Sequence, residues 1–473
     1  MNDPEFRILS FVNHIPPTAG IEEHIERAFS WGVDAVVAQG TGSDWGPFWL
    51  GSGRQVESDV ARNVLPYVRA AHRHGVPFVF SFGIAGGNVH LDKCLADFQR
   101  VCAADGLDLE VAVVRSELRP EDLAERVRTG PPVLPAADDP SLAPQLQPDD
   151  ALAATRLVAL IGPEPVQEAL RAGADGVITG RALDIGLFMA PAMNAGIPIA
   201  VAAHAAKLLE CGGLALEPGD SAHCMWARID RNSVEIRSPN PSARPTVASL
   251  VSHGFYERSH PYTEDNPGGT LDLSDVTYTE LEDDGIRGIG ARWIPAPYTV
   301  LVEGARHVGF RSISVLGVRD PALLAQARAW SDAAERQTRA RYAQEFASDR
   351  AELTTRIFGL DGVLGDLERE TAVTGHEAAV IVDVVADSQE LADQIGYYAF
   401  IRLFIGPYPG RKTTAGNAAA PYMPVIIPVG EVFRFGVYHL LPLDDPCGLF
   451  PFVLQRFGTT TTREDKVLSH AAR

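Results

Sequence analysis

A short apolar strand that passes into a helix through a glycine constrains the fold of this chain more than any other feature. Residues 176–179 have the pattern of a buried strand, Gly180 follows, and Arg181 and Asp184 stand where the next helix begins. At such a turn, unpaired backbone N–H groups, the positive end of the helix and the guanidinium converge on one point. The segment therefore predicts a parallel α/β sheet with an anion-binding turn at a strand end.

The first half of the chain repeats this alternation of strand and helix. The predicted strands cover residues 8–12, 34–38, 77–81, 109–114, 156–161, 176–179 and 197–202, and the predicted helices cover residues 21–31, 60–74, 91–104, 166–172, 184–195 and 203–210. Crossover connections of this length imply parallel strands with helices on the faces of the sheet. We therefore expect an α/β fold with a mostly parallel, Rossmann-like sheet flanked by helices, a second α+β subdomain and an appended C-terminal section.

The length of the chain and the changes in its pattern predict several domains. Its 473 residues exceed the roughly 250–300 residues at which a single core stops growing. We expect a parallel α/β domain over residues 1–220, in which the proline-rich stretch 130–150 forms a loop or lid. A mixed α+β subdomain with a long helix at 321–346 follows over 221–365, then a C-terminal section at 366–457 and a frayed tail at 458–473.

The charge of the chain excludes two classes of partner. A formal net charge of -20 repels nucleic acid phosphates and anionic lipid from most of the surface. The acidic start lacks the cationic and apolar regions of a secretory signal, so we expect a cytoplasmic protein that does not act at membranes. The cysteines are odd in number and scattered, which predicts reduced thiols and no structural metal site: Cys94, Cys102, Cys211, Cys224 and Cys447.

Polar or glycine-rich segments follow four of the predicted strands. Because the carboxyl ends of parallel strands form the ligand crevice, we expect these segments to bind substrate. The candidate residues are Asn13, His14, Gln39, Thr41, Ser43, Gly86, Gly87, Asn88, Thr179 and Gly180. The glycines can alternatively serve only to make tight turns. None of the segments matches a dinucleotide-binding or phosphate-binding glycine motif.

Arg181 is the candidate clamp for a substrate carboxylate or phosphate, or it forms a structural ion pair with Asp184. Asp184 is a candidate catalytic base or the cap of the following helix. A second basic, glycine-rich loop at 406–417 is a candidate second anion contact or, alternatively, a surface turn or an inter-subunit contact. Its candidate binding residues are Arg411, Thr413 and Asn417.

Asp44 and His253 are further candidate proton carriers, as is His14 among the binding residues. Asp44 lies between glycines in a loop that also holds Trp45 and Trp49, and aromatic walls raise a carboxyl pKa by desolvation. Alternatively, Asp44 is an exposed turn residue, and either histidine is a hydrogen-bonded core residue.

Cys211 is a poor candidate nucleophile. It follows Glu210 at a predicted helix C-terminus, where the helix dipole and the neighbouring carboxylate disfavour a thiolate.

Two stretches, residues 173–188 and 203–212, resemble the acyclic terpene utilisation family AtuA. The loops at 39–53 and 406–417 are similar to a subgroup of that family. The resemblance implies a cytoplasmic catabolic protein associated with acyl-CoA chemistry, and it supplies no catalytic residues.

Together these observations favour an enzyme that acts on a small carboxylate or acyl substrate, possibly an acyl-CoA, by acid–base chemistry of the lyase, hydratase or isomerase type. No cofactor is required by the sequence. The expected partner is a small anionic substrate, with a homo-oligomer and a small protein partner as further expectations. The alternatives are a non-catalytic binding or assembly subunit of a degradative complex and a nucleotide- or phosphate-dependent enzyme.

Overall fold

The computed structural model describes residues 4–55, 59–255, 258, 260–370, 372–413, 418–458 and 466–468. The chain divides into two compact units: a larger unit of Met1–Arg306 with Phe435–Arg473, and a smaller unit of His307–Arg434. Two long strands, β16 (Thr299–Val318) and β20 (Ile427–Pro442), run from one unit into the other. The domain boundaries expected at residues 220, 365 and 457 state which segments fold independently, and they remain a prediction.

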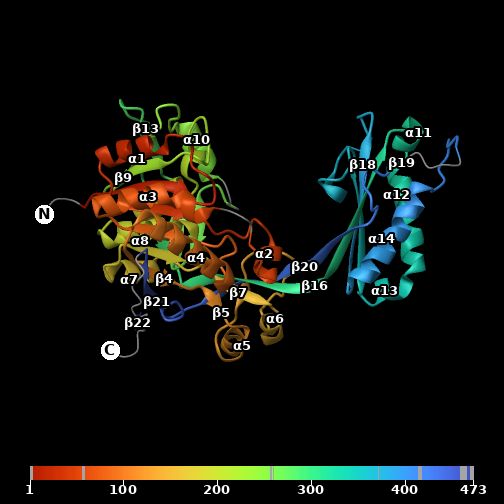
Figure 1. The fold of residues 1–473 in the computed structure, drawn as a ribbon, viewed down its shortest axis with the longest axis horizontal. Helices are drawn as coiled ribbons and strands as arrows, with labels where there is room; N and C mark the ends of the chain where they lie inside the picture. Colours follow the sequence, from red (N-terminus) through yellow and green to blue (C-terminus); the bar gives the residue numbers. More distant parts are fainter. Residues whose placement is uncertain are drawn as a thin grey trace. The chain divides into compact units, whose positions relative to one another are not determined.

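Figure 1 shows the fold of the chain, and parallel strands form the centre of the main sheet in the larger unit. In spatial order they are β1 (Phe6–Val12), β2 (Ala35–Gln39), β3 (Phe78–Ser81), β8 (Gly176–Thr179) and β4 (Leu109–Val114). All were predicted as strands, and the α/β class is confirmed. The order differs from the 3-2-1-4-5-6 order of the Rossmann fold, because β1, β2 and β3 follow one another from one side and β8 inserts between β3 and β4.

Both edges of this sheet are antiparallel, so the sheet as a whole is mixed and the expectation of a mostly parallel sheet holds only for its centre. Beyond β1 lie β9 (Met225–Ile229), β10 (Ser233–Arg237), β14 (Ile286–Ile289) and β13 (Thr277–Glu280). Beyond β4 lie β21 (Phe452–Phe457) and β22 (Lys466–Leu468). These additions come from segments distant in sequence, which a local pattern does not reveal.

Helices cover both faces of the central strands, which explains why those strands are continuously apolar. On β1, Leu9 packs in one core with α1 (Ile21–Ser30), α3 (Val60–His74) and α4 (Asn88–Asp105). Its neighbour Ile8 packs in the opposite core with α7 (Pro163–Arg171), α8 (Asp184–Asn194) and α9 (Ile199–Leu209). Successive residues of a strand thus supply two different cores.

Three predicted elements are wrong in type, partner or continuity. Residues 197–202, predicted as a strand, lead into and form the first turn of α9, since a short apolar run fits a buried helix equally well. The segment β7 (Arg156–Ala159) pairs antiparallel with β16 and stays outside the parallel sheet. The long helix predicted at 321–346 is broken into α11 (Pro321–Leu324), α12 (Ala327–Arg341) and α13 (Ala343–Ala347).

The stretch 130–150 connects α5 (Pro120–Thr129) to α6 (Pro148–Leu152) and carries the short strand β6 (Leu134–Pro135), which pairs with β20. Before it, β5 (Glu117–Leu118) pairs with β7. The role of this stretch as a lid stays a prediction.

The larger unit has several further elements, and some of them contribute residues to the cavity described below. They are α2 (Pro47–Ser52), η1 (Gly212–Ala215), α10 (Val247–Gly254) and a small antiparallel sheet of β11 (Thr263–Asn266), β12 (Gly269–Asp272) and β15 (Arg292–Pro295).

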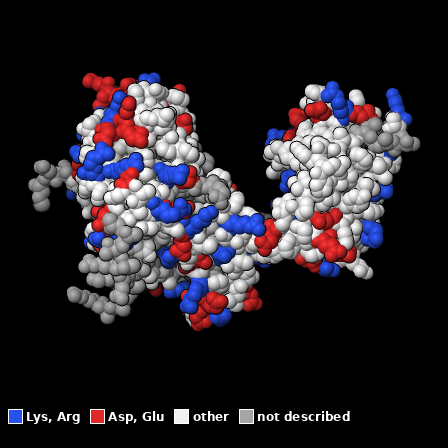
Figure 2. All heavy atoms as spheres, viewed as in Figure 1, with Lys and Arg blue, Asp and Glu red and all other residues white. Residues whose placement is uncertain are grey.

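In the smaller unit, β17 (Ala351–Phe358) and β18 (Ala378–Ala386) pair in sequence with the second half of β16. The helices α12 and α14 (Gln389–Phe404) supply side chains to its core, and β19 (Ala418–Ala419) and η2 (Gly365–Leu367) complete it. Figure 2 shows acidic and basic side chains mixed over one face of each unit. Among the helices that the structure describes, none has the length and apolar character needed to cross a bilayer.

A buried histidine makes the stability of the larger unit depend on pH. His204 in α9 is 1% exposed and lies 2.9 Å from the Tyr278 hydroxyl through its Nε2. Burial, with a contribution from the Arg258 charge, lowers the pKa of His204 from 6.5 to about 4. Its neutral form therefore stabilises the fold fully above pH 6.5, and this stabilisation is lost as the pH falls towards about 4.

We therefore predict that His204→Gln makes the free energy of unfolding less dependent on pH between about 4 and 6.5. Each such histidine contributes a slope of about 1.4 kcal/mol per pH unit in this range. Urea unfolding at several pH values measures the slope, with the exposed His72→Gln as control. A slope that is the same in His204→Gln and wild type contradicts the prediction.

Candidate functional site

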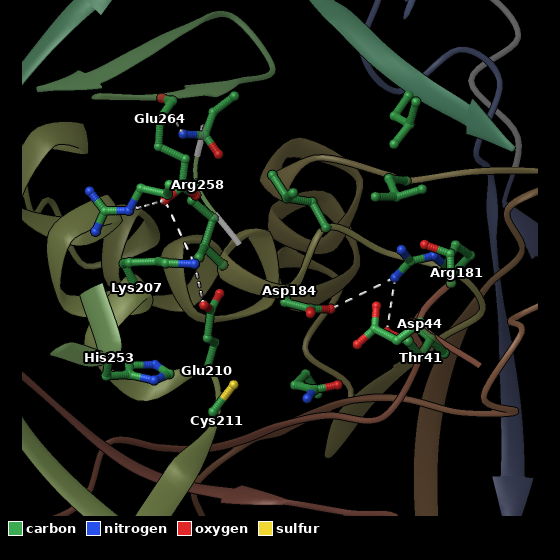
Figure 3. Close-up of a pocket in the computed structure, with 18 of the residues that line it drawn as sticks. Thr41, Asp44, Arg181, Asp184, Lys207, Glu210, Cys211, His253, Arg258 and Glu264 are labelled. Carbon is green, nitrogen blue, oxygen red and sulfur yellow. Dashed lines mark hydrogen bonds and ion pairs between the residues drawn. The ribbon is translucent and has the colours of Figure 1, made fainter. Parts of the chain in front are cut away.

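A cavity of about 1480 Å³ lies in the larger unit where β1, β2 and β8 end. It brings together predicted residues from three strand-end segments and from α10 (Figure 3). The predicted residues that line it are His14, Gln39, Thr41, Ser43, Asp44, Arg181, Asp184 and His253.

Arg181 is held firmly in the cavity wall by the protein itself. Its side chain is 7% exposed, and its Nε donates a hydrogen bond of 3.0 Å to Glu303 Oε2. Its Nη1 donates to the Thr41 carbonyl at 2.9 Å and lies 3.9 Å from Asp184 Oδ1. Burial alone would lower the pKa of the guanidinium, but the charges of Glu303 and Asp184 raise the pKa overall.

The glycine of the β3 loop supports this arrangement. The Gly86 carbonyl accepts a hydrogen bond of 3.1 Å from the Arg181 N–H, and a Cβ at Gly86 would lie 2.3 Å from the same nitrogen. Gly86 also has a φ of 69°, which favours glycine. Because the Glu303 carboxylate already pairs with the Arg181 guanidinium, a contact between Arg181 and a substrate remains a prediction.

A second charged cluster lies across Asp184 from Arg181 (Figure 3). Lys207 Nζ lies 2.6 Å from Glu210 Oε1 and 3.7 Å from Glu264 Oε2. Arg258 Nε lies 3.3 Å from the same Glu264 oxygen. Burial raises the pKa of Glu210; Lys207 opposes this shift and Glu264 and Asp184 add to it. Sequence reasoning missed Lys207, Arg258 and Glu264 because they follow no glycine motif at a strand end.

Arg258 differs from the other buried cations in its hydrogen bonding. Its side chain is only 3% exposed, and it lines the cavity. Among the residues that the structure describes, none accepts a hydrogen bond from its Nε or Nη1.

His253 and Cys211 adjoin this cluster. Burial, together with the charges of Lys207 and Arg258, lowers the pKa of His253 to about 4, although a hydrogen bond to the Lys207 backbone opposes the shift. Glu210, Cys211 and His253 each offer one ligand atom, and these atoms lie within 4.8 Å of one another. By residue type and spacing, these three residues can hold a metal ion.

Asp44 and His14 lie on the Arg181 side of the cavity. Asp44 is exposed, and Trp45 beside it is 49% exposed, so the tryptophans do not enclose the carboxylate as expected. The His14 ring packs edge-on against Trp45 with centroids 6.1 Å apart. Burial lowers the pKa of His14, and the Asp44 charge opposes this shift.

Other predicted binding residues do not line the cavity, and one of them contacts its loops. Asn13 is fully buried, and its Nδ2 donates to the Ser81 carbonyl at 2.8 Å. A Cβ at Gly40 would lie 1.9 Å from Asn13 Oδ1, which explains the glycine after β2. The predicted binding residues of the larger unit that do not line the cavity are Asn13, Gly86, Gly87, Asn88, Thr179 and Gly180.

The predicted second anion loop belongs to the smaller unit. Arg411 donates hydrogen bonds to the carbonyls of Thr413 at 2.6 Å and Ile405 at 2.8 Å. Asn417 lies outside the described residues. A role of this loop in anion binding stays a prediction.

The family of the chain is given by comparison with known proteins. A family model described as acyclic terpene utilisation family protein AtuA matches residues 53–219 and 237–433. The chain belongs to this family. The AtuA match confirms the resemblance seen in the sequence, and its two ranges contain Arg181, Glu210 and Glu303. No curated protein and no solved structure matches the chain.

We predict that Glu303→Gln lowers the free energy of unfolding by about 3–5 kcal/mol, because it leaves a buried guanidinium without its main carboxylate. Asp108→Asn is the control in the same unit, because it removes a half-exposed partner of Arg456. That change should cost no more than about 0.5 kcal/mol. Urea unfolding measures the free energy of unfolding of both variants. Equal losses of stability in Glu303→Gln and Asp108→Asn would contradict the prediction.

Proposed function

We propose that this protein is a cytoplasmic enzyme of acyclic terpenoid breakdown that transfers protons on an elongated, anionic acyl substrate, either a carboxylic acid or its thioester. The observation that carries the proposal is one cavity in which apolar walls join two charged clusters. The family description supports the metabolic setting, and the scattered free cysteines suit a reducing compartment.

The size and lining of the cavity favour a long substrate. Its volume of about 1480 Å³ exceeds the roughly 300–1,000 Å³ of most small-molecule sites. Apolar side chains for a branched hydrocarbon come from several elements: Val12, Ile15, Leu160, Leu183, Ile185, Leu301 and Leu440.

Arg258 and Lys207 supply the positive end of the site. Burying a guanidinium is costly when its Nε and Nη1 find no hydrogen-bond acceptor among the described residues, and a bound carboxylate would supply one. The planar guanidinium also matches a carboxylate in bidentate geometry. We therefore assign substrate anchoring to Arg258, while Arg181 holds the opposite wall through Glu303.

Asp184 is the proposed proton carrier. It is the first residue of α8, where the helix dipole stabilises a carboxylate. It lies between the two clusters (Figure 3), and its side chain is 27% exposed. As a base it takes a proton from the carbon beside the acyl carbonyl and returns a solvent proton to the same carbon or a neighbouring one. Asp44 lines the same cavity and can exchange that proton with solvent, whereas His253 lies in the cluster with Glu210 and Cys211.

We predict that Arg258→Met weakens binding of an acyclic terpenoid acid, such as citronellic acid, by about 10- to 100-fold, the usual worth of a hydrogen bond to a charged group. Isothermal titration with the purified chain measures the affinity. Arg244→Met is the matched control, because that side chain is 67% exposed and does not line the cavity. Unchanged affinity in Arg258→Met contradicts the assignment of the anchor.

We predict that Asp184→Asn slows proton exchange at the substrate by about 10²- to 10⁴-fold, the usual contribution of a general base. Mass spectrometry of a terpenoid acyl thioester incubated in heavy water follows deuterium incorporation. Glu22→Gln, an exposed change on α1, is the control. Deuterium incorporation at the wild-type rate in Asp184→Asn rules out Asp184 as the proton carrier. A wild-type protein that binds the thioester without exchanging its protons favours a non-catalytic binding subunit.

A further inference from the structure

One wall of the cavity carries a thiol, an imidazole and a carboxylate close together. The ligand atoms of Glu210, Cys211 and His253 lie within 4.8 Å of one another, and Glu210 and His253 are buried. We infer that these three residues bind a divalent metal ion, with Zn²⁺ favoured. Zinc combines thiolate, imidazole and carboxylate ligands, whereas calcium and magnesium prefer oxygen ligands alone. The inference does not depend on the proposed function.

Local structure holds the three ligands on two anchored segments. Glu210 and Cys211 follow directly after α9, where the chain turns into η1. A Cβ at Gly213 would lie 2.4 Å from the Asp220 carbonyl, so the turn after Cys211 is tight. His253 comes from α10, which is tied to η1 because the Ser249 hydroxyl donates to the Ala215 carbonyl at 2.9 Å. Such support is what a precise metal site needs.

Outer contacts orient two of the ligands. The His253 imidazole makes a hydrogen bond to the Lys207 backbone, and Lys207 Nζ contacts Glu210 Oε1 at 2.6 Å. Metal-binding histidines and carboxylates are normally held by such second partners. Glu210 can offer Oε2 to the ion. Ligand atoms around a tetrahedral zinc ion lie about 3–4 Å apart, so closing onto the ion needs only small side-chain movements.

The surrounding charges suit a divalent cation. With the Cys211 thiol deprotonated, four negative groups stand at the cluster: the thiolate and the carboxylates of Glu210, Glu264 and Asp184. The positive groups among them are Lys207 and Arg258. A dication balances the remaining negative charge. Binding forms a Zn–S bond and releases the thiol proton to solvent, with no change of oxidation state.

The open side of the site gives it a chemical use. Three protein ligands are typical of catalytic zinc, which keeps its fourth position for water or substrate. All three residues line the cavity, so the fourth position faces the cavity interior. An ion there can polarise an acyl carbonyl or activate a water molecule.

The test is metal binding by the full chain after chelator treatment and dialysis. Zn²⁺ is titrated by calorimetry, and Co²⁺ is followed by the near-ultraviolet charge-transfer band that a cobalt–thiolate bond produces. We expect one ion per chain. Cys211→Ser should abolish the band and weaken Zn²⁺ binding by roughly 100-fold, and His253→Gln should weaken binding similarly.

Cys447→Ser is the matched control, because Cys447 is also partly exposed and lies outside the cluster. It should keep both the cobalt band and the zinc affinity. Circular dichroism of each metal-free variant establishes that it is folded. Zinc affinity that is the same in Cys211→Ser and wild type, or an absence of stoichiometric binding to folded wild type, overturns the inference. These measurements follow metal binding and not turnover. They therefore test the metal site even if the proposed enzymatic function is wrong.

Discussion

The buried ion pair between Arg181 and Glu303 is the constraint on which the rest of the site depends. It joins the turn after β8 to β16 and places a buried charge in the wall of the cavity. Such a charge is tolerated only when it is paired and hydrogen-bonded, and the Thr41 carbonyl completes that requirement by accepting from Nη1 of Arg181. The same ion pair engages the Arg181 guanidinium, which is the cation that the strand-end motif offers for anion binding.

Because the Arg181 guanidinium is already paired, we place the proposed substrate contacts at the other end of the cavity. Lys207, Glu210, Glu264 and Arg258 form a chain of ion pairs there, and Nε and Nη1 of Arg258 have no hydrogen-bond acceptor among the described residues. Between the two ends, Asp184 has a carboxylate partly open to the cavity. A long acyl compound with one negative end satisfies both the apolar walls and the open donors, which is why we favour it over a compact anion.

Elements with a strong local pattern were predicted well from the sequence. The helix at 60–74 and the strand at 176–179 agree with α3 and β8, because a glycine after the helix and a β-branched apolar strand are local signals. Residues 197–202 were wrongly predicted as a strand, since their apolar run also fits the buried start of α9. Glu303 is distant from Arg181 in sequence, and nothing near it in the sequence indicates an ion pair. Cys211 and His253 likewise meet only through the packing of α10 against η1.

A crystal structure of the protein with an acyclic terpenoid acid tests the central claim most directly. The account predicts that the acid occupies the cavity at the ends of β1, β2 and β8. Its carboxylate should lie within hydrogen-bond distance of Arg258, and its chain should lie along Leu160 and Leu301. An acid bound elsewhere, or bound in the cavity with its carboxylate turned away from Arg258 and Lys207, would contradict the account.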